Sequence, residues 1–318
     1  MRINVKDSPA LLAGLDNVLI LTHANPDGDT LGCGFALCRA LLRMGKKVRV
    51  ACSDEIPQKY EYMFQGMNMP EFEPEHIIAV DVADTKLIGR TLKEYKERIE
   101  LCIDHHASNL LYAPKTLLDA EAGAAAEIIY QVIQELGVPF DKGMADCIYT
   151  GLSTDTGCFR YANATARTYR IAAEMIEAGA DSAEINRIMF ETKSKAYVRL
   201  EKMAMDTLEL YFNDTCAVIT LTQAMYHSSG LQDNESEGIA ALPRQIEGVV
   251  VGVTLRERVE GGYKASVRTH APVDASLICQ QMGGGGHARA AGCQIKDTLE
   301  NAKKMILSNI QKALEGTL

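Results

Sequence analysis

Short apolar runs alternate with amphipathic stretches through the first half of the chain. Four apolar runs are predicted to be buried strands, at residues 17–22, 48–52, 77–82 and 99–103. Apolar residues at helical spacing predict helices in the ranges 29–44, 122–136, 142–152 and 164–177. Strands interleaved with helices predict a parallel α/β sheet with helices on both faces. Ligands of such sheets bind beyond the carboxyl ends of the strands.

The pattern changes in the second half of the chain. Residues 181–208 are helical in character and richer in charge, as expected for a connector. Strands are predicted beyond it at 210–212, 217–221, 249–255 and 265–268, followed by an amphipathic helix at 297–314. We therefore expect a parallel-sheet α/β domain and a smaller C-terminal α+β domain. The expected boundaries are 1–185 for the first domain, 186–205 for a helical linker and 206–318 for the second domain.

Composition narrows the class of protein. A length of 318 residues suggests about two domains. The 33 Lys and Arg against 42 Asp and Glu leave a net charge of −9. This charge disfavours binding to long duplex nucleic acid but permits binding of a small anion. No apolar run approaches the ~18 residues of a membrane span, and the N-terminus lacks the apolar core of a secretory signal, so we expect a cytoplasmic protein. Nine scattered cysteines without a C-x-x-C pair argue against a disulfide framework or a structural zinc site.

Acidic and histidine side chains gather where the predicted strands end, and a last aspartate ends the helix at 142–152. They are His23, Asp27 and Asp29, then Asp81 and Asp84, then Asp104, His105 and His106, and finally Asp155. A single aspartate after a strand is more often a helix cap than a ligand, and Asp29 and Asp84 are placed to act as caps. Capping does not explain why at least three segments bring such side chains to one edge of a parallel sheet.

Divalent cations explain this convergence. Four aspartates and two histidines packed together are electrostatically unfavourable unless cations neutralise them. Carboxylate and imidazole ligands without thiolate suit Mn²⁺, Mg²⁺, Fe²⁺, Co²⁺ or Zn²⁺. The number of carboxylates exceeds what one ion needs, so we expect two ions that share a carboxylate. Such a pair activates water for in-line phosphoryl displacement.

A second polar cluster lies near the C-terminus, in the segment GGGGHARAAG at 283–292. Consecutive glycines leave backbone N–H groups free to approach an anion, although a flexible loop is an equally common reason for such a run. His287 and Arg289 beside the glycines, with Arg268 at the end of a preceding strand, favour anion binding. Residues 241–292 contain six Lys or Arg and four Asp or Glu, so this region is locally basic. We expect the second domain to hold a phosphorylated substrate.

The segments HANPDGD, AVDVADT, CIDHHASN, GLSTDTGCFRY and GGGGHARAAG together resemble the DHH–DHHA1 phosphoesterases. Within that family the chain is most similar to the bacterial nanoRNase branch, which is RecJ-like and acts as oligoribonuclease and as 3′,5′-bisphosphate nucleotide (pAp) phosphatase. The resemblance spans residues 17–295 with the motifs in the family's order. It implies a metal-binding DHH domain, a DHHA1 substrate domain and an active site in the cleft between them. It also implies two divalent ions, with Mn²⁺ expected and Mg²⁺ or Co²⁺ as alternatives.

The resemblance assigns roles to individual residues. One ion would be held by His23, Asp27 and Asp81, and the other by Asp29, Asp81, His105 and Asp155, so that Asp81 bridges the two. Asp104 would orient a ligand, and His106 would face the scissile phosphate and protonate the leaving oxygen. The terminal phosphate would be clamped by Arg268, Gly284, Gly285, Gly286 and His287, with Arg289 beside them. Arg160 and Asn163 would also reach the substrate.

The expected substrates are short single-stranded RNA, pAp or dinucleotides. We expect no membrane partner, and the oligomeric state stays open, with a homodimer as one possibility. Several readings stay open: a phosphodiesterase for cyclic or linear dinucleotides, a RecJ-like single-strand exonuclease, and a nucleotide-sensing module without turnover. A nucleic-acid-binding protein that acts through its C-terminal domain is disfavoured by the acidic charge. A pyrophosphatase is disfavoured by the glycine-rich segment. Loss of a metal ligand would favour the sensing module, and every expected ligand position is filled.

Overall fold

The computed structural model describes residues 1–232 and 236–317. The chain forms two compact units, Met1–Thr192 and Lys193–Leu318. The division falls inside the range expected for a helical linker. Helix α7 (Lys195–Met205), which the sequence placed in that linker, packs against strand β7 (Cys216–Leu221) and is part of the second unit.

A five-stranded parallel sheet forms the centre of the first unit, in the order β2-β1-β3-β4-β5. Its strands are β1 (Val18–Leu21), β2 (Val48–Ala51), β3 (His76–Val80), β4 (Ile99–Asp104) and β5 (Lys115–Leu118). The apolar runs predicted the first four strands. They did not predict β5, because its KTLL sequence is short and only half apolar.

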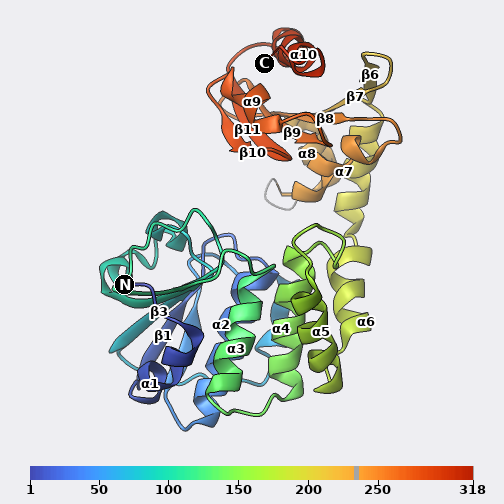
Figure 1. The fold of residues 1–318 in the computed structure, drawn as a ribbon. Helices are drawn as coiled ribbons and strands as arrows, with labels where there is room; N and C mark the ends of the chain where they lie inside the picture. The colour runs from blue at the N-terminus through green and yellow to red at the C-terminus, as the bar shows by residue number, and fades with distance from the viewer. Residues whose placement is uncertain (233–235, 318) are drawn as a thin grey trace. The chain divides into compact units, whose positions relative to one another are not determined.

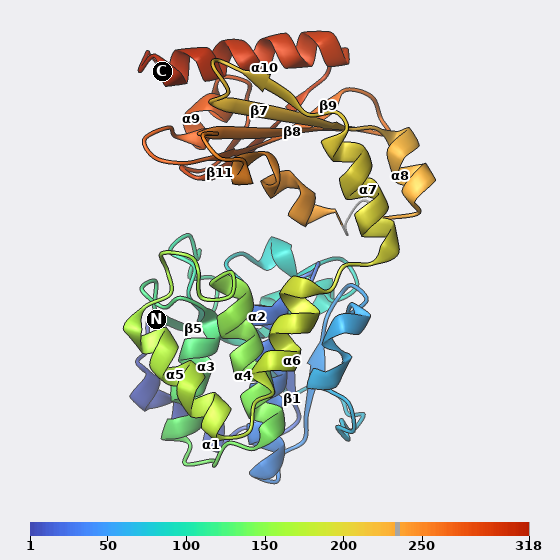
Figure 2. The same ribbon diagram turned by 90° about the vertical axis from the view of Figure 1, so that its right-hand side faces the viewer.

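The α-helices of the first unit lie on one face of this sheet, where α2 and α3 pack against the strands, α4 packs on these two helices, and α5 and α6 pack on α4 (Figures 1 and 2). They are α1 (Ser8–Ala13), α2 (Gly28–Arg43), α3 (Ala125–Glu135), α4 (Lys142–Asp155), α5 (Ala166–Glu177) and α6 (Ser182–Asn186), the last followed by a π-helical turn at Arg187–Glu191. The expectation of helices on both faces needs correction. The second face is covered by the 3₁₀ turns Thr85–Ile88 and Lys93–Arg98 and by Tyr112 and Ala113. Both 3₁₀ turns lie in the connection between β3 and β4, at residues 81–98.

The strand pairing brings the loops that follow β1, β3 and β4 to one edge. Leu21, the last residue of β1, is paired with Ala79 of β3, and Val80 is paired with Ile103 of β4. The first residues beyond these strands therefore leave the sheet at adjacent positions. Parallel strands place their carboxyl ends at one edge, so the register of the sheet, and not contacts among the polar side chains, selects this location.

The second unit is built on a six-stranded mixed sheet in the order β10-β11-β9-β8-β7-β6. Beside β7, the strands are β6 (Glu209–Tyr211), β8 (Val251–Glu257), β9 (Tyr263–Thr269), β10 (Gly285–His287) and β11 (Ala290–Ile295). The β7–β8 pair is parallel and the other pairs are antiparallel. The sequence pattern predicted β6 to β9 but not the β10–β11 hairpin, whose glycine and alanine residues carry no apolar alternation.

Helices α9 (Ala275–Gln280) and α10 (Leu299–Leu314) bury one face of this sheet (Figures 1 and 2). On the other face, α7, α8 (Gln223–Ser229) and the 3₁₀ turns Glu237–Ala241 and Pro243–Gln245 pack near β7 and β8. Beyond them, β9, β11 and the glycine run line a pocket of about 620 Å³. Within the described part of the chain, each helix is too short or too polar to cross a membrane.

Candidate metal centre and phosphate pocket

The six residues expected to bind metal lie together at the carboxyl edge of the first unit's sheet. In three groups the potential ligand atoms all lie within 4.8 Å of one another. Asp81, His105 and His106 form one of them, which joins the other two. Those two share no residue: the first is His23, Asp27 and Asp81, and the second is Asp29, His105 and Asp155. Asp81 Oδ1 lies 3.6 Å from the Nε2 atom of His105, so Asp81 touches both groups.

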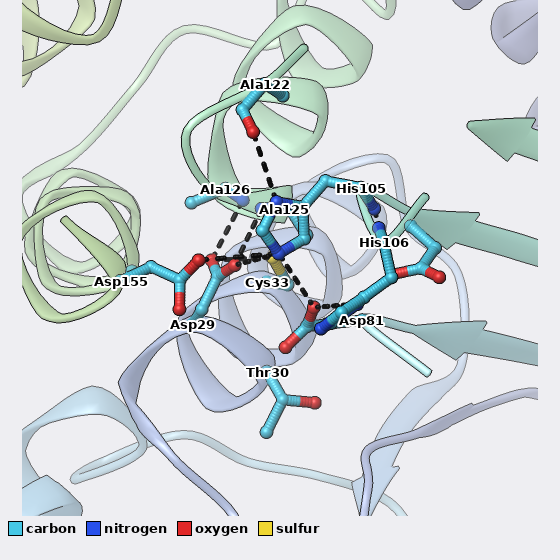
Figure 3. A network of polar contacts seen from close by, with 12 residues as sticks. Asp29, Thr30, Cys33, Asp81, His105, His106, Ala122, Ala125, Ala126 and Asp155 are labelled. Carbon is cyan, nitrogen blue, oxygen red and sulfur yellow. Dashed lines mark hydrogen bonds and ion pairs between the residues drawn. The ribbon is translucent and has the colours of Figure 1, made fainter. Parts of the chain in front are cut away.

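The two histidines are held with one ring nitrogen aimed at the carboxylates. His105 Nδ1 donates to the Ala122 carbonyl at 3.1 Å, and His23 Nδ1 donates to the Ala24 carbonyl at 2.8 Å. Because a backbone carbonyl only accepts, Nδ1 carries a proton, and Nε2 is the ring nitrogen that would bind a metal ion, as in metal-ligating histidines. Figure 3 shows Asp29, Asp81 and Asp155 gathered around the His105 ring. Its Nε2 atom lies 3.4 to 3.9 Å from their oxygens, too far for good hydrogen bonds.

The start of α2 supplies two candidate ligands, Asp27 and Asp29, whose side chains have different backbone partners. Asp27 is the N-cap of this helix, and its Oδ1 accepts from the backbone N–H groups of Asp29 and Thr30, both at 3.0 Å. Asp27, and not Asp29, is therefore the cap of this helix, which removes capping as the alternative role for Asp29. Asp29 is fully buried and accepts from Ala125 N at 2.6 Å and Ala126 N at 2.9 Å, at the start of α3 (Figure 3).

Asp81 is the most constrained of the ligands. It directly follows β3 with a left-handed φ of 57°, which is costly for an aspartate and is tolerated where the surroundings enforce it. Its backbone N–H donates to Ile103 O at 2.8 Å. Its side chain is buried, and Oδ1 has no hydrogen-bond partner within the described residues. A buried, unpaired carboxylate oxygen facing imidazole nitrogens fits a divalent cation.

The electrostatics of the cluster favour the same interpretation. Burial raises the pKa of Asp81 well above its usual range, and the neighbouring Asp29 carboxylate raises it further. Burial also raises the pKa of Asp29, and burial with the Asp29 and Asp81 charges raises the pKa of Asp155 to about 9. These carboxylates resist ionising together, and divalent cations would restore the charged forms. The donor set of carboxylate oxygens and imidazole nitrogens suits such ions.

Asp104 holds His106 in place. It is fully buried at the end of β4, where Oδ1 accepts from the His106 Nδ1–H at 2.8 Å and from the His105 N–H at 2.8 Å. Asn109 donates to the other oxygen at 2.6 Å. Sequence reasoning missed Asn109, although it lies in the same CIDHHASN segment. The hydrogen bond to Asp104 raises the pKa of His106 to about 9 and leaves its half-exposed ring able to donate a proton.

Replacing His106 by asparagine is expected to lower kcat about a hundredfold with little change in KM, because proton donation contributes that order of rate. Steady-state kinetics on a phosphoester substrate check this. The exposed pair of His76 with Glu100 supplies the control, since His76→Asn removes a paired histidine far from the metal ligands. Equal effects of both substitutions would contradict a role for His106 in proton transfer.

Arg160 and Asn163 follow α4, and both side chains contact other parts of the first unit. The Arg160 Nε donates to Gly157 O at 2.6 Å, and its guanidinium lies over the Phe190 ring. The Asn163 amide donates to Gly123 O at 2.9 Å and to the backbone carbonyl of Asp155 at 3.2 Å. Asn163 thus ties the end of α4 to the residues before α3.

In the second unit the glycine run is part of a hairpin. Gly285 and Gly286 belong to edge strand β10, where they pair with Gly292 and Ala291 of β11. The pocket beside them is lined by the side chains of β9 and by the glycines themselves, namely Lys264, Ser266, Arg268 and Gly283 to Gly286, with residues 290–294 and Met282. Arg268 and Gly284 to Gly286, which the sequence assigned to a phosphate clamp, lie in one pocket.

His287 and Arg289 are not among the residues that line this pocket. His287 is exposed at the end of β10. The Arg289 guanidinium donates to the Val273 carbonyl at 2.6 Å and so links the hairpin turn to the segment before α9.

The glycines of the run differ in what a side chain would meet. A Cβ on Gly284 would lie 2.3 Å from Gly292 O and 2.5 Å from Cys293 Cβ, whereas a Cβ on Gly285 meets open space. Gly284→Ala is therefore expected to destabilise the second unit by about 1–3 kcal/mol. Gly285→Ala should leave its stability unchanged within about 0.5 kcal/mol. Urea unfolding measures both, and equal midpoints would contradict the close packing of Gly284.

Comparison with known proteins matches both units. The DHH family, N-terminal domain, matches residues 17–152, and the DHHA1 domain matches residues 213–316. The bifunctional oligoribonuclease and PAP phosphatase NrnA of Thermus thermophilus is 32% identical over 305 residues, which cover 93% of this chain and 90% of that protein. The protein of the same name from Bacillus subtilis is 25% identical and covers 88% of this chain and 90% of its own. The crystal structure of an exopolyphosphatase-related protein from Bacteroides fragilis has a TM-score of 0.86 at 25% identity, covering 97% of this chain and 95% of that one.

Proposed function

Because the chain belongs to the DHH family and also carries a DHHA1 domain, we propose that it is a metal-dependent phosphoesterase. Its substrates are short oligoribonucleotides, which it hydrolyses to mononucleotides, and pAp, from which it removes the 3′-phosphate. Relatives named for these two activities match about nine tenths of the chain. The observation that carries the proposal is the convergence of two ligand groups on the buried Asp81 carboxylate.

Two divalent cations, with Mn²⁺ preferred, are the proposed cofactors. The ligands of one are His23, Asp27 and Asp81, and those of the other are Asp29, Asp81, His105 and Asp155. When bound, such a pair polarises a water molecule and neutralises the phosphoryl oxygens during in-line displacement. Backbone hydrogen bonds hold four of these side chains, those of His23, Asp27, Asp29 and His105, before substrate arrives, which limits reorganisation during the reaction.

The remaining residues handle the proton and the substrate. His106, oriented by Asp104, donates a proton to the departing ribose oxygen. Arg268 and the glycine run bind the terminal phosphate of the substrate, which suits a pocket built from cationic side chains and glycines. The Gly284 N–H takes no part, because it donates to the Cys279 carbonyl at 2.9 Å. A clamp for one terminal phosphate favours short substrates and needs no extended basic surface, in agreement with the net charge of −9.

The test compares substrates of increasing length. The Mn²⁺-loaded protein is incubated with pAp, the linear dinucleotide pApA, a 5-mer and a 24-mer RNA, and the mononucleotide products are separated by chromatography. We expect pAp, pApA and the 5-mer to be hydrolysed much faster than the 24-mer. Fastest turnover of the 24-mer would instead identify a RecJ-like exonuclease.

Two further arms complete the comparison. Cyclic dinucleotide is added as a fifth substrate, and its preferential hydrolysis would replace the proposal by a cyclic-dinucleotide phosphodiesterase. Nucleotide binding without hydrolysis of any substrate, in protein shown to contain Mn²⁺, would identify a sensing module. Asp81→Asn protein is the blank for contaminating nucleases.

A further inference from the structure

One backbone segment contacts two of the proposed metal ligands directly, His105 and Asp29. This lead-in segment, residues 119–126, precedes and begins α3. Ala122 O accepts from the His105 ring, and the N–H groups of Ala125 and Ala126 donate to Asp29. The segment also reaches Asp155 indirectly, through the Asn163 amide that joins its Gly123 carbonyl to the Asp155 carbonyl. Its position therefore sets the position of the ligands.

The part of the lead-in segment next to α3 has no side-chain cap of its own. At the start of the segment the Asp119 carboxylate accepts from the Glu121 N–H at 3.0 Å, but residues 122–126 are only glycine and alanine, and the N-cap residue Ala124 makes no side-chain capping bond. Such a helix start is usually held by a Ser, Thr, Asp or Asn side chain. Glu127, in the first turn of α3, supplies the missing contact, because its Oε1 accepts from the Gly123 N–H at 3.2 Å.

Glu127 is itself held from α5. It is fully buried, Thr168 Oγ1 donates to its Oε1 at 2.5 Å, and the Arg167 Nε donates to its Oε2 at 2.5 Å. The other end of the Arg167 guanidinium pairs with Asp119 at 2.9 Å. Arg167 thus joins the start of the lead-in segment to the residue directly after its end.

The helix dipole alone does not account for this arrangement. A carboxylate in the first turn of a helix is favourable, which explains an acidic residue at this point of α3. It does not explain why the carboxylate is buried, or why Arg167 also reaches Asp119. Buried ion pairs contribute little net stability, since desolvation offsets the attraction, but they do fix geometry. A planar guanidinium suits this bridging task better than an ammonium group.

We propose that Glu127, Arg167 and Thr168 are positioning residues for the metal centre, which act through the lead-in segment on His105 and Asp29. The inference rests on the proposed function, because it concerns the ligands of the proposed ions. None of the three side chains contacts a ligand side chain in the hydrogen bonds described above. Their role is to hold the Ala122 carbonyl and the Ala125 and Ala126 N–H groups where the two ligands need them.

The decisive variant is Arg167→Gln, because Arg167 is partly exposed. Its loss leaves the Oε2 atom of the buried Glu127 without this partner but keeps the Oε1 hydrogen bonds to Thr168 and Gly123. We expect its Mn²⁺ affinity, measured by isothermal titration calorimetry, to fall tenfold or more, as is common when groups behind a metal ligand are lost. The visible absorption spectrum of the Co²⁺-loaded protein should change as well, because it reports ligand geometry. Arg167→Lys keeps the positive charge but lacks the planar guanidinium that binds Glu127 and Asp119 at once, so it should retain the Mn²⁺ affinity only in part.

The matched control is Arg187→Gln. Arg187 is another arginine of the first unit, and its guanidinium makes two hydrogen bonds to the Glu184 carboxylate on the exposed surface. The Mn²⁺ affinity and Co²⁺ spectrum of this variant should equal those of the wild type. Asp119→Asn breaks the same bridge from the partly exposed loop side, so it decides the matter if an Arg167 variant fails to fold.

The outcomes distinguish a failure of the positioning role from a failure of the proposed function. If the wild type binds Mn²⁺ and both Arg167→Gln and Asp119→Asn retain its affinity and spectrum, the positioning role is overturned and the proposed function stands. If the wild type itself binds no Mn²⁺, the proposed function fails. Weaker Mn²⁺ binding with a changed Co²⁺ spectrum in both variants, but not in Arg187→Gln, supports the inference.

Discussion

Replacing Asp81 by asparagine is expected to lower the hydrolysis rate of every substrate about a thousandfold or more. Asp81 contacts both ligand groups: Oδ2 lies 3.7 Å from His23 Nε2, and Oδ1 lies 3.6 Å from His105 Nε2. Asparagine has the same shape but no charge, so it weakens both proposed ion sites at once. Metal ions supply several kcal/mol of transition-state stabilisation, and each ~1.4 kcal/mol is a factor of ten in rate.

The measurement is kcat on pAp and on a 5-mer RNA, with metal content determined in parallel. Asp84→Asn is the matched control, because Asp84 follows the same strand three residues later but caps the 3₁₀ turn at Thr85–Ile88. It should retain activity within about twofold, since surface and capping changes act on stability. Retention of more than a tenth of the activity in Asp81→Asn would contradict the shared ligand.

The convergence of the candidate ligands could be predicted because it depends on a property of the fold that short-range patterns reveal. Apolar runs identified β1, β3 and β4, and parallel strands place their carboxyl ends at one edge. His23, Asp81 and His105 follow those strands and so had to lie near one another. The structure brings them within contact distance.

Other features depend on contacts that no local pattern records. Asp29 looks like a helix cap in the sequence, but it accepts from N–H groups almost a hundred residues away, at the start of α3. Asn109 has no periodic signature, and only the folded chain shows it bonded to Asp104. The glycine run was interpreted as an anion-binding loop. Its pairing with β11 makes it an edge strand as well, in a tight hairpin whose glycine and alanine residues show no apolar alternation.

Removal of divalent ions with EDTA is expected to abolish hydrolysis and to lower the thermal stability of the first unit. Ions that bind the folded state stabilise it by about 2.7 kcal/mol at a concentration one hundred times Kd. For a unit of this size that corresponds to roughly 5–10 °C in Tm. Differential scanning calorimetry with EDTA or with Mn²⁺ measures the difference. Ca²⁺ should restore less than Mn²⁺, because the proposed ligands include imidazole.

The stability of the metal-free protein should also depend on pH in a defined direction. Burial raises the pKa of Asp29, Asp81 and Asp155 above the value of 3.8 expected in the unfolded chain, to about 9 for Asp155. The folded state therefore binds these protons more tightly. Their contribution to stability is fully present below about pH 4 and is lost as the pH rises towards 9.

The histidines of the site act in the same direction. The hydrogen bond to Asp104 raises the pKa of His106 to about 9. Burial lowers the pKa of His23, but Asp27 and Asp81 outweigh it and raise the value to about 11. Their contribution is present below pH 6.5 and declines above it.

Two carboxyl groups have the opposite shift. Burial would raise the pKa of Asp27, but His23 lowers it, and His106 with Asn109 likewise lowers the pKa of Asp104 against burial. Both groups are ionised in the folded and unfolded states above about pH 5, so they do not alter the trend. The Tm in EDTA should therefore fall steadily from pH 5 to pH 9.

Mn²⁺ should oppose this fall in Tm. Metal ions compete with protons for the same ligands, so the stabilisation by Mn²⁺ increases as the pH rises. The difference in Tm between the Mn²⁺ and EDTA samples is expected to widen from pH 5 to pH 8. Asp81→Asn protein, scanned in parallel, should show a much smaller difference throughout. A difference that is constant with pH in the wild type would mean that the ions bind elsewhere than among these buried carboxylates.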